Sequence, residues 1–198
     1  MEIPIIISVS YFLGSIPFGY IIAKLKGIDI TKLGSGNIGA TNVGRFLGKK
    51  YFFIVLFLDA LKGFLPVMIF KNLYGIDYGI LAGLFAVIGH SFSIFMRFKG
   101  GKGVATGFGI SLGLIPLETI IAFVIWFITL YIFKIMALAS IIGAISVFIL
   151  VLFFEKSIIL KIVVGFLSAL IVFLHRGNIE RMIKGIEPKF YFFEKKGG

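Results

Sequence analysis

The chain contains no cysteine, few charged residues and very few acidic ones. Of its 198 residues, only 15% are charged, and nine are Asp or Glu. The absence of thiols excludes disulfides, thiolate metal sites and a cysteine acyl-enzyme. A soluble chain of this length needs about a quarter charged residues to cover its surface. Water therefore cannot be the only solvent around this protein.

Hydrophobic residues fill the composition instead. They make up 59% of the chain, which also holds 24 Phe and 25 Gly. Small residues let membrane helices approach one another, and apolar aromatic residues face acyl chains. We therefore predict one all-α, membrane-embedded domain over residues 1–198. The N-terminal segment has no basic region before its apolar run and no small-residue cleavage site after it, so we expect that run to remain as a span.

Seven apolar runs are candidates for membrane spans, for which a helix needs about 20 residues. They are Ile3–Ala23, Tyr51–Phe70, Tyr78–Phe95, Val104–Ile115, Thr119–Phe133, Ile135–Phe154 and Ser157–Leu174. The fourth and fifth runs are short and are separated around Pro116. They form either one interrupted span or two short spans hinged there.

The distribution of Lys and Arg favours two short spans. Basic residues crowd segments 24–50, 97–102 and 176–196, whereas the connectors on the other side hold only Lys71 and Lys156. The positive-inside rule puts the three basic segments in the cytoplasm. With the N-terminus outside, we predict about seven transmembrane helices and a cytoplasmic C-terminus. Five spans satisfy the same rule and are the alternative.

The net charge of +11 points to anionic lipid or anionic substrates. A nucleic-acid-binding protein would need a soluble basic face, which this chain lacks, so we expect no nucleic acid. Charged residues inside spans are costly and face protein or a water-filled cavity. Asp59 and Lys62 are three residues apart in one span, and we expect a structural ion pair.

The first polar segment, Gly34–Arg45, is rich in Gly, Ser and Asn. If a helix begins near Asn37, then Asn37, Thr41 and Arg45 lie on one of its faces. An amide, a hydroxyl and a guanidinium beneath a positive helix end suit a phosphate. The segment also contains G-x-G-x-x-G, but no strand precedes it and a membrane span follows, which excludes a dinucleotide fold.

The second segment, Phe98–Thr106, places two lysines among three glycines before an apolar helix. This pattern is typical of an anion cradle. It is not a Walker A loop, because Gly103 stands where that motif requires Ser or Thr. His90, just upstream, is expected in the inner half of its helix, where a structural role competes with a catalytic one.

The third segment, Leu174–Arg181, follows the last span. His175 and Asn178 share a face if the helix continues, although Gly177 is a possible helix end. Beyond it, Phe190–Phe193 lies between Lys189 and Lys195, which predicts an interfacial anchor.

Three motifs occur in order along the chain: S-G-N-x-G-A-T-N-x-x-R at Ser35–Arg45, G-H-x-F at Gly89–Phe92 with F-K-G-G-K-G-V-A-T at Phe98–Thr106, and H-R-x-N-I-x-R at His175–Arg181. Together they resemble the bacterial acyl-phosphate:glycerol-3-phosphate acyltransferase family (PlsY) over nearly the whole chain. The resemblance implies a multi-pass enzyme of the bacterial inner membrane with its active site on the cytoplasmic face. It implies acyl transfer from acyl phosphate to glycerol 3-phosphate, which gives lysophosphatidate and phosphate, the first step of phospholipid synthesis.

The resemblance also implies which residues act. The catalytic candidates are Ser35, Arg45, His175 and Asn178. Glu187 matches a glutamate with a structural role. The Gly100–Gly103 loop with Lys102 resembles the family's glycerol-phosphate site, and with the polar pattern of the first two segments it gives the candidates for substrate binding: Asn37, Thr41, Lys99, Gly100, Gly101, Lys102, Gly103 and Thr106. We expect a monomer whose partners are its two substrates and membrane lipid. No pair of cytoplasmic carboxylates is spaced to hold a metal, so we expect no metal and no other cofactor.

Two features of the mechanism stay open at this stage. Either His175, polarised by Asn178, or the substrate's own phosphate takes the hydroxyl proton. Ser35 either binds substrate, which we favour, or forms an acyl-enzyme. Glu180 stands where other glycerolipid acyltransferases place an Asp relative to a His, but no Asp is present there, which disfavours that mechanism. A transporter for a phosphorylated metabolite or lipid is the alternative function, although the polar motifs gather at one membrane face and not at the midplane.

Overall fold

The computed structural model describes residues 2–191, and every regular element among them is helical. The elements are α1 (Glu2–Ser15), α2 (Phe18–Leu25), η1 (Ile30–Lys32), α3 (Ala40–Leu47), α4 (Lys49–Tyr74), α5 (Ile76–Ser91), η2 (Ile94–Met96), α6 (Val104–Leu114), α7 (Pro116–Phe133), α8 (Met136–Phe154), α9 (Ile158–Leu174) and α10 (Arg176–Ile183). Part of the predicted interfacial anchor, Phe192 and Phe193, and the basic residues Lys195 and Lys196 lie outside the described residues.

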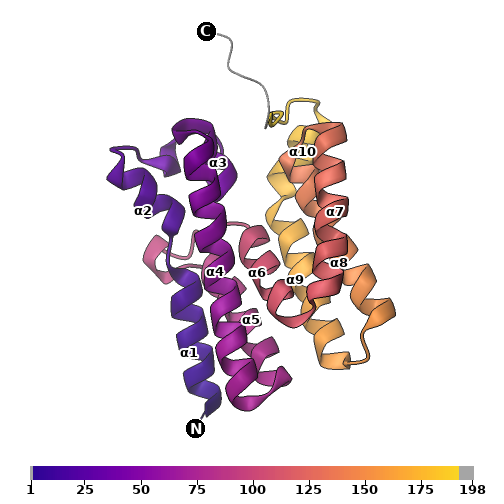
Figure 1. The fold of residues 1–198 in the computed structure, drawn as a ribbon. Coiled ribbons are helices and arrows are strands. Elements are labelled where there is room, and N and C mark those ends of the chain that lie inside the picture. Colours follow the sequence, from indigo (N-terminus) through magenta and orange to yellow (C-terminus); the bar gives the residue numbers. More distant parts are fainter. Residues whose placement is uncertain (1, 192–198) are drawn as a thin grey trace.

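The helices form a bundle with α6 at its centre. Helices α1, α4 and α5 pack together on one side and α7, α8 and α9 on the other, and α6 contacts both α4 and α7 (Figure 1). Helices α2, α3 and α10 lie at the same end of the bundle, opposite the start of α1. The first and third polar segments, which adjoin α3 and α10, are therefore at this end, and the second leads into the central helix α6.

Five helical segments are long and apolar enough to cross a membrane: Glu2–Leu25, Lys49–Tyr74, Ile76–Met96, Pro116–Phe133 and Met136–Phe154. Helices α9 and α10 supply a sixth if this pair, bent by 52°, is one broken span. The count falls short of the expected seven because α6 has only 11 residues. At 1.5 Å per residue it is roughly 16 Å long, about half the hydrocarbon thickness. The expected separation at Pro116 is confirmed, because α7 begins there.

The first apolar run is broken, which the hydropathy did not indicate. Helix α1 ends at Ser15 and α2 begins at Phe18, with Pro17 between them. Proline has no backbone N–H and its ring clashes with the preceding turn, so it interrupts the helix. Lys62 of α4 donates a hydrogen bond of 2.7 Å to the carbonyl oxygen of Ile16, at this break.

The expected ion pair within α4 is confirmed. Asp59 Oδ1 lies 2.8 Å from Lys62 Nζ, and both side chains are buried. Because Lys62 also bonds to Ile16, one buried cation satisfies a carboxylate and a carbonyl that the break exposes. Both groups would otherwise be costly at this depth.

Glycines bring α6 very close to α4. A Cβ on Gly109 would lie 1.9 Å from the carbonyl oxygen of Ala60, and one on Gly63 would lie 2.3 Å from that of Thr106. Only glycine permits such an approach between two helix backbones. This contact fixes the height of α6 in the bundle, and its N-terminus lies beside the first polar segment.

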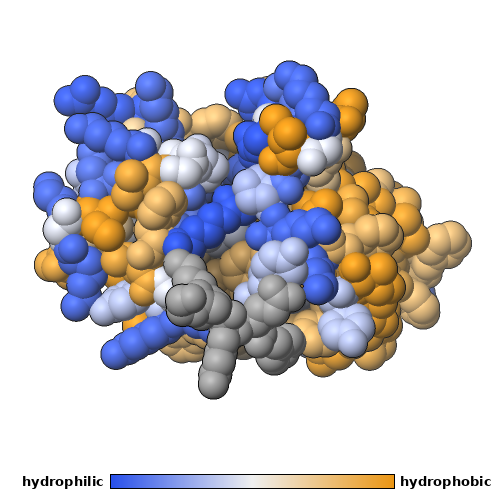
Figure 2. All heavy atoms as spheres, turned by 90° about the horizontal axis from the view of Figure 1, so that it is seen from above, coloured by the Kyte–Doolittle hydropathy of each residue, from blue (hydrophilic) through white to orange (hydrophobic). Residues whose placement is uncertain are grey.

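The two kinds of surface are clearly separated. Large exposed apolar side chains line the flanks of the bundle, for example Phe57 of α4, Phe153 of α8 and Ile162 of α9. Figure 2 views the end that carries α2, α3 and α10, and it shows hydrophilic side chains at the centre and over much of the left and upper rim, with a broad apolar surface on the right flank. The flanks are suited to lipid and the polar end to water.

Candidate active site

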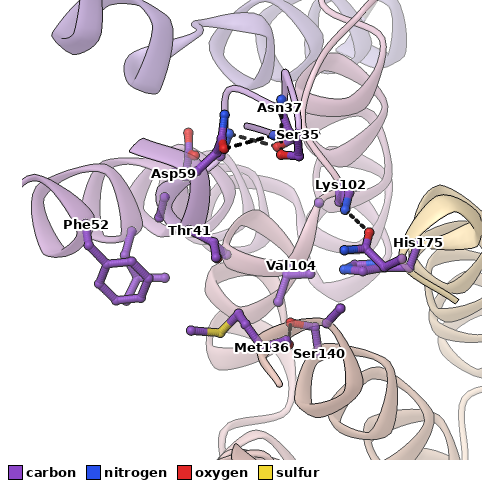
Figure 3. Close-up of a pocket in the computed structure, with 18 of the residues that line it drawn as sticks. Ser35, Asn37, Thr41, Phe52, Asp59, Lys102, Val104, Met136, Ser140 and His175 are labelled. Atoms are coloured by element: carbon purple, nitrogen blue, oxygen red, sulfur yellow. Dashed lines mark hydrogen bonds between the residues drawn. The ribbon is translucent and has the colours of Figure 1, made fainter. Parts of the chain in front are cut away.

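A cavity of about 120 Å³ opens among the three polar segments. It collects eight of the twelve predicted site residues, from α3, α10, the loops before α3 and α6, and the bend between α9 and α10 (Figure 3). These eight are Ser35, Asn37, Thr41, Arg45, Lys102, Gly103, His175 and Asn178.

The other four predicted residues do not line this cavity. Lys99 is exposed, and Thr106 is fully buried in α6. Gly100 and Gly101 hold the loop against the end of α5, where their N–H groups donate to the carbonyl oxygens of Ser91 and His90, each at 3.0 Å. A Cβ on Gly101 would lie 2.2 Å from His90 Nε2. These two glycines therefore position the loop that carries Lys102.

The helix of the first segment, α3, begins at Ala40 and not near Asn37, the start on which the shared face of Asn37, Thr41 and Arg45 depended. Asn37 precedes the helix, and its Oδ1 accepts a hydrogen bond of 2.9 Å from the N–H of Gly39. This local bond competes with helix formation and stabilises the turn before it. Asn37, Thr41 and Arg45 still converge on the cavity.

Two helix N-termini point at the cavity. Gly39 and Thr41 at the start of α3, and Gly103 and Val104 at the start of α6, are among the lining residues. Gly103 has φ +81°, a left-handed conformation that glycine adopts without strain. Unpaired N–H groups and the helix dipole make each of these ends favourable for an anion.

The third segment is a bend between two helices, and Gly177 does not end the second of them. Helix α9 stops at Leu174, the axis turns by 52° at His175, and α10 continues through Gly177. The N–H of Asn178 donates to the carbonyl oxygen of His175 at 2.8 Å. Both side chains are buried, and both line the cavity.

A chain of polar contacts joins the second segment to the third. Lys102 Nζ donates to Asn178 Oδ1, and Asn178 Nδ2 donates to Glu187 Oε1 at 2.6 Å. Arg181 Nε lies 2.7 Å from the other oxygen, Glu187 Oε2. Glu187 is thus a buried acceptor that orients both Asn178 and Arg181.

The cavity has a positive electrostatic character. Burial lowers the pKa of Lys102 to about 8; Glu187 acts in the opposite direction, while Arg181 and Arg45 lower it further. Burial also lowers the pKa of Arg45. Among residues 2–191, the Arg45 guanidinium makes no hydrogen bond or contact ion pair. Its N–H groups are available to an anion in a fork that matches phosphate geometry.

His175 and Ser35 differ in how they present their polar atoms. His175 Nδ1 lies 2.7 Å from the carbonyl oxygen of Ile171. A carbonyl only accepts, so Nδ1 carries the hydrogen, and Nε2 is the nitrogen left for other partners. The Ser35 hydroxyl accepts a weak 3.4 Å hydrogen bond from the N–H of Asn37. That contact is within its own loop and supplies no base to activate the hydroxyl.

The cavity is also lined by residues outside the twelve predicted site residues. Asp59 and His90 form its inner wall, with His90 Nδ1 3.8 Å from Asp59 Oδ1. Trp126 and Ser140 line the side nearest α7 and α8. A single hydroxyl in an apolar run is a weak sequence signal for a site residue. The Ser140 Oγ donates a hydrogen bond of 2.9 Å to the carbonyl oxygen of Met136. No group of three or more metal-ligating side chains is found in the described part of the chain.

The sequence matches the family described as glycerol-3-phosphate acyltransferase over residues 4–185. The glycerol-3-phosphate acyltransferase of Aquifex aeolicus is 44% identical over 184 residues, which cover 91% of this chain and 95% of the relative. That of Bacillus subtilis is 44% identical over 190 residues, which cover 96% and 98%.

Two crystal structures of PlsY, an integral membrane glycerol 3-phosphate acyltransferase, have the same fold. The glycerol 3-phosphate form superposes with a TM-score of 0.93 at 41% identity, and 96% of each chain is covered. The lysophosphatidic acid form superposes with a TM-score of 0.89 at 42% identity, and 98% of each chain is covered. Sequence and fold agree along nearly the whole length. This chain therefore belongs to the glycerol-3-phosphate acyltransferase family.

Proposed function

We propose that this protein transfers an acyl group from acyl phosphate to glycerol 3-phosphate, and releases lysophosphatidate and inorganic phosphate. The proposal rests on the observation that a cationic cavity is continuous with an apolar one. An apolar cavity of about 480 Å³ shares five lining residues with the polar cavity. They are Leu56, Val104, Ala105, Trp126 and Ser140.

The two cavities match the two ends of the donor. The mixed anhydride and its phosphate belong among Arg45, Lys102 and the helix ends, and the acyl chain belongs in the apolar cavity. An acyl phosphate already carries a good leaving group, so the protein needs mainly to hold two phosphorylated molecules together and stabilise an oxyanion. The forms in which PlsY was crystallised, with glycerol 3-phosphate and lysophosphatidic acid, support the acceptor and the product.

In the proposed reaction the glycerol hydroxyl oxygen attacks the carbonyl carbon. The bond between that carbon and the phosphate oxygen breaks, and phosphate leaves with the electron pair. His175 Nε2 takes the hydroxyl proton, because Nδ1 is held by the carbonyl of Ile171. Arg45 and Lys102 neutralise the phosphates, and Asn178 orients Lys102. Ser35 binds substrate and forms no acyl-enzyme.

We also propose that the polar end of the bundle faces the cytoplasm and that the N-terminus is outside. The exposed lysines at this end include Lys24, Lys49 and Lys184, whereas the opposite end carries Lys71 and Lys156. This asymmetry follows the positive-inside rule. The start of α1 and α10 lie at opposite ends of the bundle, as an odd number of passes requires, with α6 as a short seventh pass.

The test is turnover by purified protein in detergent. With acyl phosphate and labelled glycerol 3-phosphate, we expect labelled lysophosphatidate, and the Arg45→Ala variant should lose most of that activity. Acyl-coenzyme A in place of acyl phosphate should give no product. A transporter needs two compartments, so absence of turnover in detergent together with uptake by reconstituted vesicles would favour the transporter instead.

A further inference from the structure

The apolar cavity runs from the polar site to a packed cluster of apolar side chains at its other end. Its α6 wall is formed by residues at helical spacing along one face, from Val104 and Ala105 at the polar site to Leu114 and Ile115 at the far end. The cavity therefore runs parallel to α6 for about ten residues, or roughly 15 Å at 1.5 Å per residue.

The wall of this cavity offers almost no polar group to a ligand. Three of the four hydroxyls that line it donate to backbone carbonyl oxygens of the protein: Thr119 to Ile115 at 2.7 Å, Ser140 to Met136 at 2.9 Å and Ser168 to Ala144 at 2.9 Å; the fourth is that of Ser111. Such a wall suits an unbranched hydrocarbon chain. Its direct continuity with the polar cavity identifies the occupant as the acyl chain of the donor.

The far end is closed by a tightly packed cluster. Ile115, whose exposed fraction is 1%, packs there with Val151, Leu160 and Val164. Ile115 and Val164 also line the cavity, and Val147 of α8 lines it from the facing side. This cluster joins the α6–α7 turn to α8 and α9, so it is held from three directions and cannot yield easily.

We propose that Ile115, with Val147 facing it, is the floor that limits the length of the acyl chain. An extended alkyl chain with C–C bonds of about 1.5 Å advances roughly 1.3 Å per carbon. About 15 Å therefore accepts about a dozen carbons beyond the reacting end. Longer chains must fold back or leave part of their length in lipid. This inference rests on the proposed function, because it identifies the apolar cavity with the acyl site.

The chain offers a matched pair of variants for the test. Ile115 and Ile80 belong to the same cluster and are equally buried, each 1% exposed, but Ile80 does not line the cavity. Ile115→Ala should extend the cavity, whereas Ile80→Ala should cause a similar loss of packing elsewhere. Val147→Phe should shorten the cavity, and Ile149→Phe, on the lipid-facing side of the same helix, is its control.

The experiment measures kcat/KM for a series of saturated acyl phosphates that differ by two carbons. We expect Ile115→Ala to raise kcat/KM for chains longer than the wild-type optimum by about tenfold, relative to kcat/KM at that optimum. The reason is that an apolar pocket discriminates by about this factor between ligands that differ by one methylene. Val147→Phe should shift the optimum to shorter chains. Ile80→Ala and Ile149→Phe should keep the wild-type profile.

Wild-type length profiles in both Ile115→Ala and Val147→Phe, with turnover retained, would overturn the floor and leave the proposed function intact. An equal shift in Ile115→Ala and Ile80→Ala would also overturn it, because the effect would then come from loosened packing. If Ile115→Ala does not fold, the shift in Val147→Phe alone decides. Wild-type protein that acylates glycerol 3-phosphate from no acyl phosphate in the series would instead overturn the proposed function.

Discussion

The Lys102 ammonium donates a hydrogen bond to the side-chain oxygen of Asn178, which is 76 residues away in the sequence. This contact joins the glycine-rich loop before α6 to the helix after the bend at His175. Glu187 accepts from the other end of the same amide. Lys102 is thus held by a residue that is itself held by a buried carboxylate.

Removal of the Glu187 carboxylate should weaken both the fold and the site. In Glu187→Ala, Asn178 and Arg181 lose an ionised acceptor, and hydrogen bonds to charged groups contribute about 1.5–3 kcal/mol each. We expect a fall in melting temperature of several degrees, measured by thermal unfolding in detergent. Glu180→Ala, an exposed carboxylate on α10, is the control and should unfold like the wild type. Equal melting temperatures for the two variants would contradict this role of Glu187.

The affinity for glycerol 3-phosphate should depend on the charge of Lys102. Burial lowers the pKa of this lysine to about 8, so in the free enzyme the ammonium is present below pH 8 and is lost above it. The KM for glycerol 3-phosphate should therefore rise as the pH increases through about 8. Lys102→Arg keeps its charge over this range and should remove the pH dependence, even if its KM is higher throughout. Lys99→Arg, at an exposed position, should keep the wild-type profile; an alkaline rise that persists in Lys102→Arg would point to another group.

Contact between Gly101 and His90 should make the glycine loop intolerant of a side chain. In Gly101→Ala the new Cβ would lie 2.2 Å from His90 Nε2. The loop must then shift, and we expect the KM for glycerol 3-phosphate to rise about tenfold or more, with a smaller effect on that for acyl phosphate. Adding His90→Ala should recover part of the loss. Gly177→Ala is the control, because the nearest atom to its Cβ would be Arg181 Nη1 at 3.7 Å. Equal increases in both KM values would indicate a general loss of folding.

Replacement of His175 distinguishes a protein base from a substrate base. If Nε2 takes the hydroxyl proton, His175→Ala should lower kcat by about 10²–10⁴-fold with little change in either KM. The acidic limb of the pH–rate profile should disappear as well. Arg176→Ala, an exposed neighbour, should have little effect. A loss that appears mainly in KM, with the acidic limb retained, would assign proton transfer to the substrate phosphate and binding to His175.

The proposed orientation can be measured directly because the chain has no native cysteine. Single cysteines at the exposed positions Lys49, Lys99 and Lys184 should react with a membrane-impermeant reagent only from the cytoplasmic side. Cysteines at Asn72 and Lys156 should react only from outside. Labelling of the position-184 cysteine from outside would exclude both the orientation and the short seventh pass through α6.

Much of the architecture was readable from local sequence. The scarcity of charge and the apolar runs predicted a helical membrane protein, and the Asp59–Lys62 spacing predicted their ion pair. Pro116 marked the boundary between α6 and α7. The three polar motifs named eight of the residues that line the cavity. Each of these features depends on composition or on neighbours within one turn of a helix, which a sequence displays directly.

Other features depend on how the helices pack. The break at Pro17 keeps α2 from continuing α1, and the close approach of Gly109 to Ala60 sets the position of the 11-residue α6; neither is visible in hydropathy. The hydrogen bond from Lys102 to Asn178 and the floor at Ile115 join residues that are distant in sequence. The sequence by itself therefore determined that the protein is embedded in a membrane, where its helices lie and what chemistry its polar segments offer. These features follow from side-chain type and local spacing. Only the tertiary structure decided which segments meet, how deep the apolar cavity runs and which atoms are left for a substrate, because these follow from packing between helices.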